Sequence, residues 1–133
     1  GLLMGAQAFF DQAKPRGWGR IVNIASSRSF TPAEPNMIAY GVSKLGMHAL
    51  TRAFAENGAA SGITANTVCP GMVMTENLRK RISEEEYRAT CAHIPVRRGG
   101  SCEEMADGVL FAIKNGYVTG ESIHINGGLY YAP

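Results

Sequence analysis

The chain has 133 residues, which is enough for one domain with a hydrophobic core and too few for two. Apolar residues make up 45% and charged residues 18%, as in ordinary globular proteins. The net charge of +2 is too small to make nucleic acid or an anionic membrane the expected partner. No apolar stretch approaches ~20 residues, so we expect no membrane-spanning helix.

The cysteines and the N-terminal residues indicate in which cellular compartment the protein is expected. Cys69, Cys91 and Cys102 are odd in number and form no C-x-x-C pair. The first residues lack the basic lead and the cleavage site of a signal peptide. We therefore expect a reduced, cytoplasmic setting. Cys91 and His93 offer two metal ligands where zinc needs three or four, so we expect no metal site.

Helical and β-type patterns alternate along the first half of the chain. Apolar residues at helical spacing predict a helix over residues 2–13, which Pro15 ends. The β-branched run 21–24 predicts a buried strand, and a loop rich in Ser and Pro follows it. A long helix is predicted over residues 38–57. Its inner face is predicted to carry Leu45, Ala49, Leu50 and Phe54.

The second half continues the alternation. Residues 63–69 predict a second strand, which the turn at Pro70-Gly71 ends. Two capping boxes, at residues 83–86 and 101–104, predict helix starts, and the second helix is predicted to run to about Lys114. A third strand is predicted over residues 122–126.

The order helix, strand, helix, strand, helix, strand predicts an α/β fold with a parallel sheet. Three parallel strands make a poor sheet alone, because the first strand would expose an unpaired edge. The chain also begins at Gly1 inside a helical pattern. We therefore expect residues 1–133 to form a single partial domain, the second part of a larger fold.

Tyr40 and Lys44 form the first candidate catalytic pair. They are four residues apart at the start of the long predicted helix, so both side chains lie on one face, one turn apart. A free phenol holds its proton too firmly to act as a base at neutral pH, and a nearby cation favours the phenolate. Such a phenol can give a proton to a carbonyl oxygen or take one from an alcohol. A hydroxyl from Ser26 or Ser27 would orient the substrate oxygen.

Five segments in order resemble the classical short-chain dehydrogenase/reductase family, in particular members that act as 3-oxoacyl-carrier-protein reductases. These are residues 19–27 (GRIVNIASS), 39–44 (AYGVSK), 63–75 (ITANTVCPGMVMT), 94–106 (IPVRRGGSCEEMA) and 117–128 (YVTGESIHINGG). The resemblance covers nearly the whole chain. It implies the C-terminal, catalytic half of a Rossmann-like, doubly wound parallel sheet, without the N-terminal dinucleotide-binding βαβ units.

The resemblance also implies roles for single residues. Tyr40 is the acid/base and also contacts the cofactor. Lys44 lowers the pKa of Tyr40 and binds the nicotinamide ribose. Pro70 and Gly71 face the nicotinamide, and Val73 offers its backbone to the carboxamide. Thr75 offers its hydroxyl to the carboxamide or the phosphates.

The catalytic serine has two candidates in the sequence. The strand pattern that ends in Ile24-Ala25-Ser selects Ser26, with one extra residue in the loop 30–35. The family's usual spacing of thirteen residues before the tyrosine selects Ser27 instead. We prefer Ser26, because a strand fixes geometry better than a loop does.

The resemblance implies an oxidoreductase that interconverts a ketone and a secondary alcohol with NAD or NADP. The implied partners are a small carbonyl or alcohol substrate and further copies of the chain, in a homodimer or homotetramer. The family's glycine-rich loop and catalytic Asn are absent from these residues. The alternative is therefore a non-catalytic fragment or subunit-interaction module. A weaker alternative is epimerisation or dehydration by the same Tyr and Lys.

Two sets of residues carry secondary expectations. Apolar side chains are expected beside the reactive ring of the cofactor, which favours a substrate with hydrophobic character; these are Phe30, Met72, Met74 and Leu78. His48 is predicted to be a helix-surface or interface residue, and His124 a strand residue.

Overall fold

The computed structural model describes residues 2–32 and 34–131, in which three parallel strands form one sheet in the order β1-β2-β3. The strands are β1 (Gly19–Ile24), β2 (Ile63–Pro70) and β3 (Ser122–Ile125). The α-helices are α1 (Leu2–Ala13), α2 (Ile38–Gly58), α3 (Glu76–Arg79), α4 (Glu84–Cys91) and α5 (Cys102–Lys114). Short 3-10 turns cover Lys14–Arg16, Ser27–Ser29, Pro35–Met37 and Ala59–Ser61.

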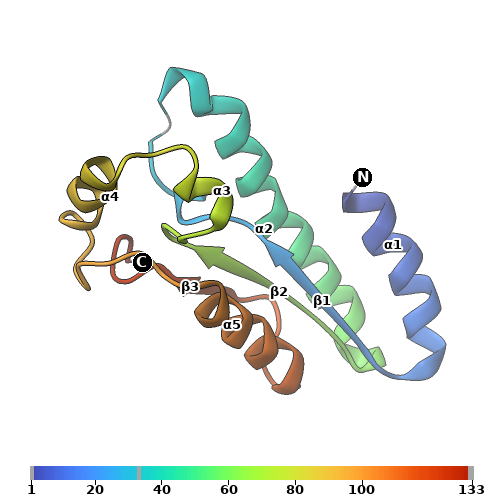
Figure 1. Ribbon diagram of the computed structural model, residues 1–133. Coiled ribbons are helices and arrows are strands. Elements are labelled where there is room, and N and C mark those ends of the chain that lie inside the picture. The colour runs from blue at the N-terminus through green and yellow to red at the C-terminus, as the bar shows by residue number, and fades with distance from the viewer. Residues whose placement is uncertain (1, 33, 132–133) are drawn as a thin grey trace.

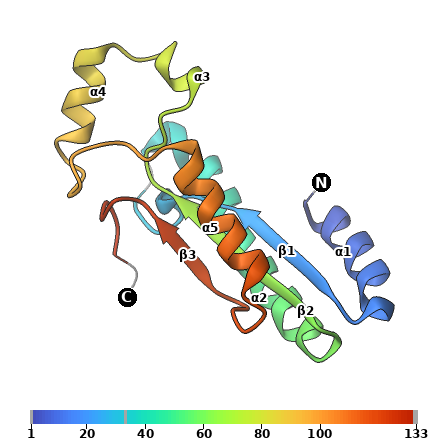
Figure 2. The same ribbon diagram turned by 60° about the horizontal axis from the view of Figure 1, so that its bottom comes forward.

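Helices cover both faces of the sheet, which confirms the predicted fold class. Helix α2, beside α1, packs against one face, and α5 lies across the other (Figures 1 and 2). Helices α3 and α4 lie beyond the carboxyl ends of the strands (Figure 1). Within the described residues, β1 pairs only with β2, from Gly19 opposite Ile63 to Ile24 opposite Val68.

The core lies around β2, the central strand. Ile63, Ala65, Val68 and Cys69 are completely buried, because neighbours flank this strand on both edges and helices cover both of its faces. Phe10 of α1 packs on Phe54 of α2, with ring centroids 5.6 Å apart. The two helices therefore share the apolar cluster that covers the start of β1 and β2.

The predicted inner face of α2 is wrong for Leu45 and Ala49, which are exposed. Leu50 is half-buried, and Phe54 is half-buried and packs against the core as predicted. The buried residues of α2 are smaller or polar: His48, Thr51, Ala55 and Gly58. Small side chains let the helix lie close to β2; a Cβ on Gly58 would meet the Ile63 side chain at 3.0 Å. The buried polar side chains are hydrogen-bonded to the sheet instead of facing solvent.

The two predicted capping boxes are confirmed. Ser83 accepts a hydrogen bond from the Glu86 backbone, and Ser101 accepts one from the Glu104 backbone, with the reciprocal glutamate contacts present in both. They begin α4 and α5. No helix in the described part of the chain is long and apolar enough to cross a membrane.

Candidate active site

Tyr40 and Lys44 lie on the first turns of α2, next to the carboxyl end of β1. The Lys44 Nζ donates a hydrogen bond of 2.8 Å to the Ile24 carbonyl, the last residue of β1. The same Nζ lies 5.7 Å from the centroid of the Tyr40 ring. Tyr40 is 39% exposed. The ammonium is therefore anchored to the strand end while the phenol stays open to a ligand.

A chain of buried hydrogen bonds holds α2 against the sheet below this pair. Asn23 Nδ2 of β1 donates to Thr51 Oγ1 of α2 at 2.7 Å. Thr51 Oγ1 and Thr67 Oγ1 of β2 are also 2.7 Å apart. All three residues are at most 4% exposed. These polar groups therefore determine where the helix, and with it Tyr40, lies over the strand ends.

His48 is buried, so its predicted surface position is wrong. The residue is 2% exposed, and its Nδ1 lies 2.7 Å from Ser122 Oγ of β3. Its ring meets the Phe30 ring edge-on, with centroids 4.6 Å apart. His124 lies on β3 as predicted, against the same Phe30 ring. Burial first, and then the charge of Arg52 and the neighbouring His124, lower the pKa of His48.

His48 and the half-buried His124 make folding stability depend on pH. Burial also lowers the pKa of His124. Both histidines therefore have a lower pKa in the folded chain than in the unfolded chain, where the imidazole binds a proton near pH 6.5. The unfolded state then binds more protons as the pH falls below that value, and the free energy of unfolding decreases.

We expect the thermal unfolding midpoint to fall by several degrees between about pH 7.5 and about pH 5.5. His48→Gln, which removes one of the titrating rings, is expected to reduce that fall. An equally steep fall in the variant, followed by circular dichroism, would contradict this role of His48.

Ser26 and Ser27 lie where β1 gives way to a short turn. The Ser26 Oγ caps that turn and accepts a hydrogen bond of 3.2 Å from the Arg28 backbone. Both serines and Tyr40 line one cavity of about 400 Å³. The loop with the extra residue includes Ala33, which lies outside the described residues. The cavity thus contains both serine candidates and does not choose between them.

The Pro70-Gly71 turn completes the cavity from β2. The Gly71 N–H donates to the Ile125 carbonyl at 2.9 Å. A Cβ on Gly71 would lie 2.7 Å from Asn126 Cα, so only glycine allows this close approach of two backbones. Of the predicted site residues, Ser26, Tyr40 and Gly71 line the cavity together. Those that do not line it are Lys44, Pro70, Val73 and Thr75.

The rest of the cavity is mostly apolar. Met72 and Leu78 line it as expected, with Met37, Ile82 and Leu129. The other two side chains do not line this cavity. Phe30 stacks on Tyr130 and packs against His48 instead, and Met74 lines a different cavity.

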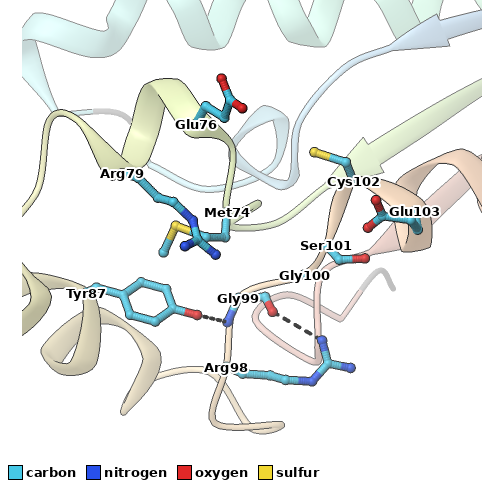
Figure 3. Close-up of a pocket in the computed structure, with 10 residues that line it drawn as sticks. All are labelled: Met74, Glu76, Arg79, Tyr87, Arg98, Gly99, Gly100, Ser101, Cys102 and Glu103. Atoms are coloured by element: carbon cyan, nitrogen blue, oxygen red, sulfur yellow. Dashed lines mark hydrogen bonds between the residues drawn. The ribbon is translucent and has the colours of Figure 1, made fainter.

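A larger cavity, of about 630 Å³, lies between α3, α4 and the start of α5 (Figure 3). The Tyr87 hydroxyl accepts a hydrogen bond of 3.3 Å from the Gly99 N–H (Figure 3). Arg98 also forms an ion pair of 2.6 Å with Glu104. Hydrogen bonds from Arg98 lower the pKa of the Glu104 carboxyl to about 2. Neither Tyr40 nor either serine lines this space. The smaller cavity is therefore the candidate active site, despite its size.

Comparison with known proteins places the chain in a family. A model of the family described as Enoyl-(Acyl carrier protein) reductase matches residues 1–130. An acetoacetyl-CoA reductase of Rhizobium meliloti (strain 1021) is 40% identical over 121 residues, which are 90% of this chain and 50% of that protein. A 3-oxoacyl-(acyl-carrier-protein) reductase of Buchnera aphidicola subsp. Acyrthosiphon pisum is 36% identical over 114 residues, 84% of this chain and 46% of that one.

A solved structure of a dehydrogenase also resembles this chain. The gluconate 5-dehydrogenase from Burkholderia cenocepacia J2315, in complex with NADP and tartrate, superposes with a TM-score of 0.84 at 30% identity. The match covers 93% of this chain and 49% of that one. The chain belongs to the short-chain dehydrogenase/reductase family, as its motifs predicted. It spans about half the length of the curated relatives that it matches.

Proposed function

We propose that the protein containing this chain interconverts a ketone and a secondary alcohol with NAD or NADP. One observation carries the proposal: Tyr40, with Lys44 beside it, opens onto a cavity that also holds two serine side chains. The relatives named above are reductases and a dehydrogenase, which supports the same class of reaction.

Tyr40 is the proposed proton donor in the reducing direction. The Ser26 Oγ accepts from the Arg28 N–H, so its own proton is available for a carbonyl oxygen in the cavity. With that oxygen held, the Tyr40 hydroxyl passes its proton to it, and the reverse transfer serves alcohol oxidation. The Lys44 ammonium stabilises the phenolate that remains.

The residues on this edge of the sheet fit a nicotinamide cofactor. Ligands of open parallel sheets bind at the carboxyl ends of the strands, where Gly71 and Val73 lie. Thr75 Oγ1 accepts from the Leu78 N–H, which leaves its proton to donate, and two protons of Lys44 Nζ remain beyond the bond to Ile24. We propose that the residues holding the cofactor are Tyr40, Lys44, Pro70, Gly71, Val73 and Thr75. When bound, it supplies or accepts the hydride at the substrate carbon.

Matched substitutions in the full natural protein distinguish the roles of Ser26 and Ser27. We expect Ser26→Ala to lower kcat for ketone reduction by about 100-fold, the usual effect of losing one donor to a developing oxyanion, and Ser27→Ala to lower it much less. The measurement is the oxidation of NADPH or NADH with a simple ketone. The opposite ranking assigns the catalytic role to Ser27, and no nicotinamide oxidation in the unsubstituted protein contradicts the proposed reaction.

The alternative is a non-catalytic fragment. The unpaired edge of β1 among the described residues and the half-length match to the relatives favour a partial domain as the unit of folding. We accordingly propose residues 1–133 as part of one larger domain. Fluorescence titration of residues 1–133 with NADH separates the two functions: binding supports a catalytic unit, and its absence supports the fragment.

We further propose self-association into a dimer or tetramer. Large apolar side chains are exposed along two helices, among them Leu3 and Met4 of α1 and Val42 and Leu45 of α2. Light scattering of the full protein tests this, and a monomer would contradict it. The three cysteines are free thiols, which supports the proposed cytoplasmic setting.

A further inference from the structure

Arg28 is the one charged residue among the described residues that line the candidate active-site cavity. The other lining side chains are neutral, and five of them are apolar: Met37, Met72, Leu78, Ile82 and Leu129. Arg28 also lines a smaller recess together with Tyr40. Arg28 therefore shares the lining of a mostly apolar cavity with the proposed proton donor.

The Arg28 guanidinium has only a loose contact with an acidic partner. Within residues 2–32 and 34–131, its one ion-pair partner is Glu34, with Arg28 Nη1 and Glu34 Oε1 3.6 Å apart. That distance exceeds the range of a hydrogen bond. The two side chains are 52% and 66% exposed, so solvent screens the pair and its contribution is small.

The backbone of Arg28 has a separate role from its side chain. The Arg28 N–H donates a hydrogen bond to the Oγ of Ser26, the preferred catalytic serine. This bond holds the Arg28 backbone, and so the base of its side chain, next to that serine. A substitution at position 28 keeps this N–H and removes only the guanidinium. The side chain can therefore be tested without losing the serine's hydrogen bond.

We propose that Arg28 forms a carboxylate subsite, so that the preferred substrate is a ketone with a free carboxylate and an apolar chain. A guanidinium offers two parallel N–H donors that match the two oxygens of a carboxylate, and it would exchange the loose contact with Glu34 for that geometry. The apolar side chains accommodate the remaining carbon chain. This inference rests on the proposed ketone reduction and names its substrate class.

The test compares two ketones that differ only in charge, 3-oxohexanoate and 3-oxohexanamide, in the full natural protein. We expect kcat/KM for the acid to exceed that for the amide by at least about 10-fold, as a hydrogen bond to a charged group provides. Arg28→Gln is expected to remove that preference, chiefly by raising KM for the acid. Arg28→Lys is expected to keep part of it.

Two controls make the result specific. The circular dichroism spectrum reports whether the Arg28→Gln protein is folded, and any reduction of the amide shows that it is active, so the ratio of acid to amide can be measured. Arg79→Gln removes the same charge from the larger cavity and is expected to leave the ratio of acid to amide unchanged.

Each failure has a distinct signature. If both ketones react and the ratio is near one, or stays unchanged in Arg28→Gln, the carboxylate subsite is wrong while the proposed function stands. If neither ketone is reduced by the unsubstituted protein, both the subsite and the proposed function are wrong.

Discussion

Replacing Tyr40 by Phe is expected to lower kcat for nicotinamide-dependent ketone reduction by about 100- to 10,000-fold, the range that a positioned general acid contributes. The ring and its place beside Lys44 Nζ remain, and only the proton that the substrate oxygen receives is lost. The measurement is the rate of NADPH or NADH oxidation by the full natural protein at saturating ketone.

The same variant carries its own control. Because Tyr40 is 39% exposed, losing one hydroxyl should leave the circular dichroism spectrum and the thermal midpoint nearly unchanged. Tyr117, which is almost fully exposed and does not line the cavity, offers a matched Tyr→Phe change without effect on kcat. Turnover in Tyr40→Phe equal to that of the unsubstituted protein would remove Tyr40 from the reaction.

Thr51→Val is expected to lower the free energy of unfolding by about 1–3 kcal/mol, because it leaves two buried polar groups without a partner. These are the Asn23 Nδ2 and the Thr67 Oγ1, each 2.7 Å from Thr51 Oγ1. Valine fills nearly the same volume, so a cavity does not contribute to the loss. Urea denaturation measures the change.

Thr64→Val is the matched control for this prediction. Thr64 is also buried, on the same strand as Thr67, but its Oγ1 has no hydrogen-bond partner in the described part of the chain. Removing an unpaired hydroxyl should be neutral or stabilising. Equal losses in Thr51→Val and Thr64→Val would show that the hydrogen-bond chain through Thr51 is not what holds α2 on the sheet.

Much of the fold follows from local patterns. The three strands and the helices α1, α2 and α5 lie within two residues of their predicted bounds, because periodicity, prolines and capping boxes act within a few residues. The closeness of Tyr40 and Lys44 follows from their spacing on one helix. Ser26 and Gly71 line the same cavity because each follows a strand of the parallel sheet, and the carboxyl ends of these strands lie at one edge.

The contacts between distant elements could not be predicted in the same way. Helix α2 carries both an apolar stripe through Leu45 and a polar one through His48 and Thr51, and the pattern alone favoured the apolar stripe. The polar stripe is buried because its partners lie on β1, β2 and β3, 16 to 74 residues away in the chain. The place of Arg28 beside Tyr40 depends likewise on an irregular loop, which has no periodicity to indicate it.

The central claim is that Tyr40 moves a proton on oxygen while a nicotinamide exchanges a hydride with the adjoining carbon. Its most direct test is the reduction of a ketone by the full natural protein with NADPH or NADH deuterated at the transferable C4 position. The account predicts one deuterium on the carbinol carbon of the alcohol, read by mass spectrometry, and a roughly 100- to 10,000-fold slower formation of that deuterated alcohol when Tyr40 is Phe. An alcohol that forms without that deuterium would contradict the account.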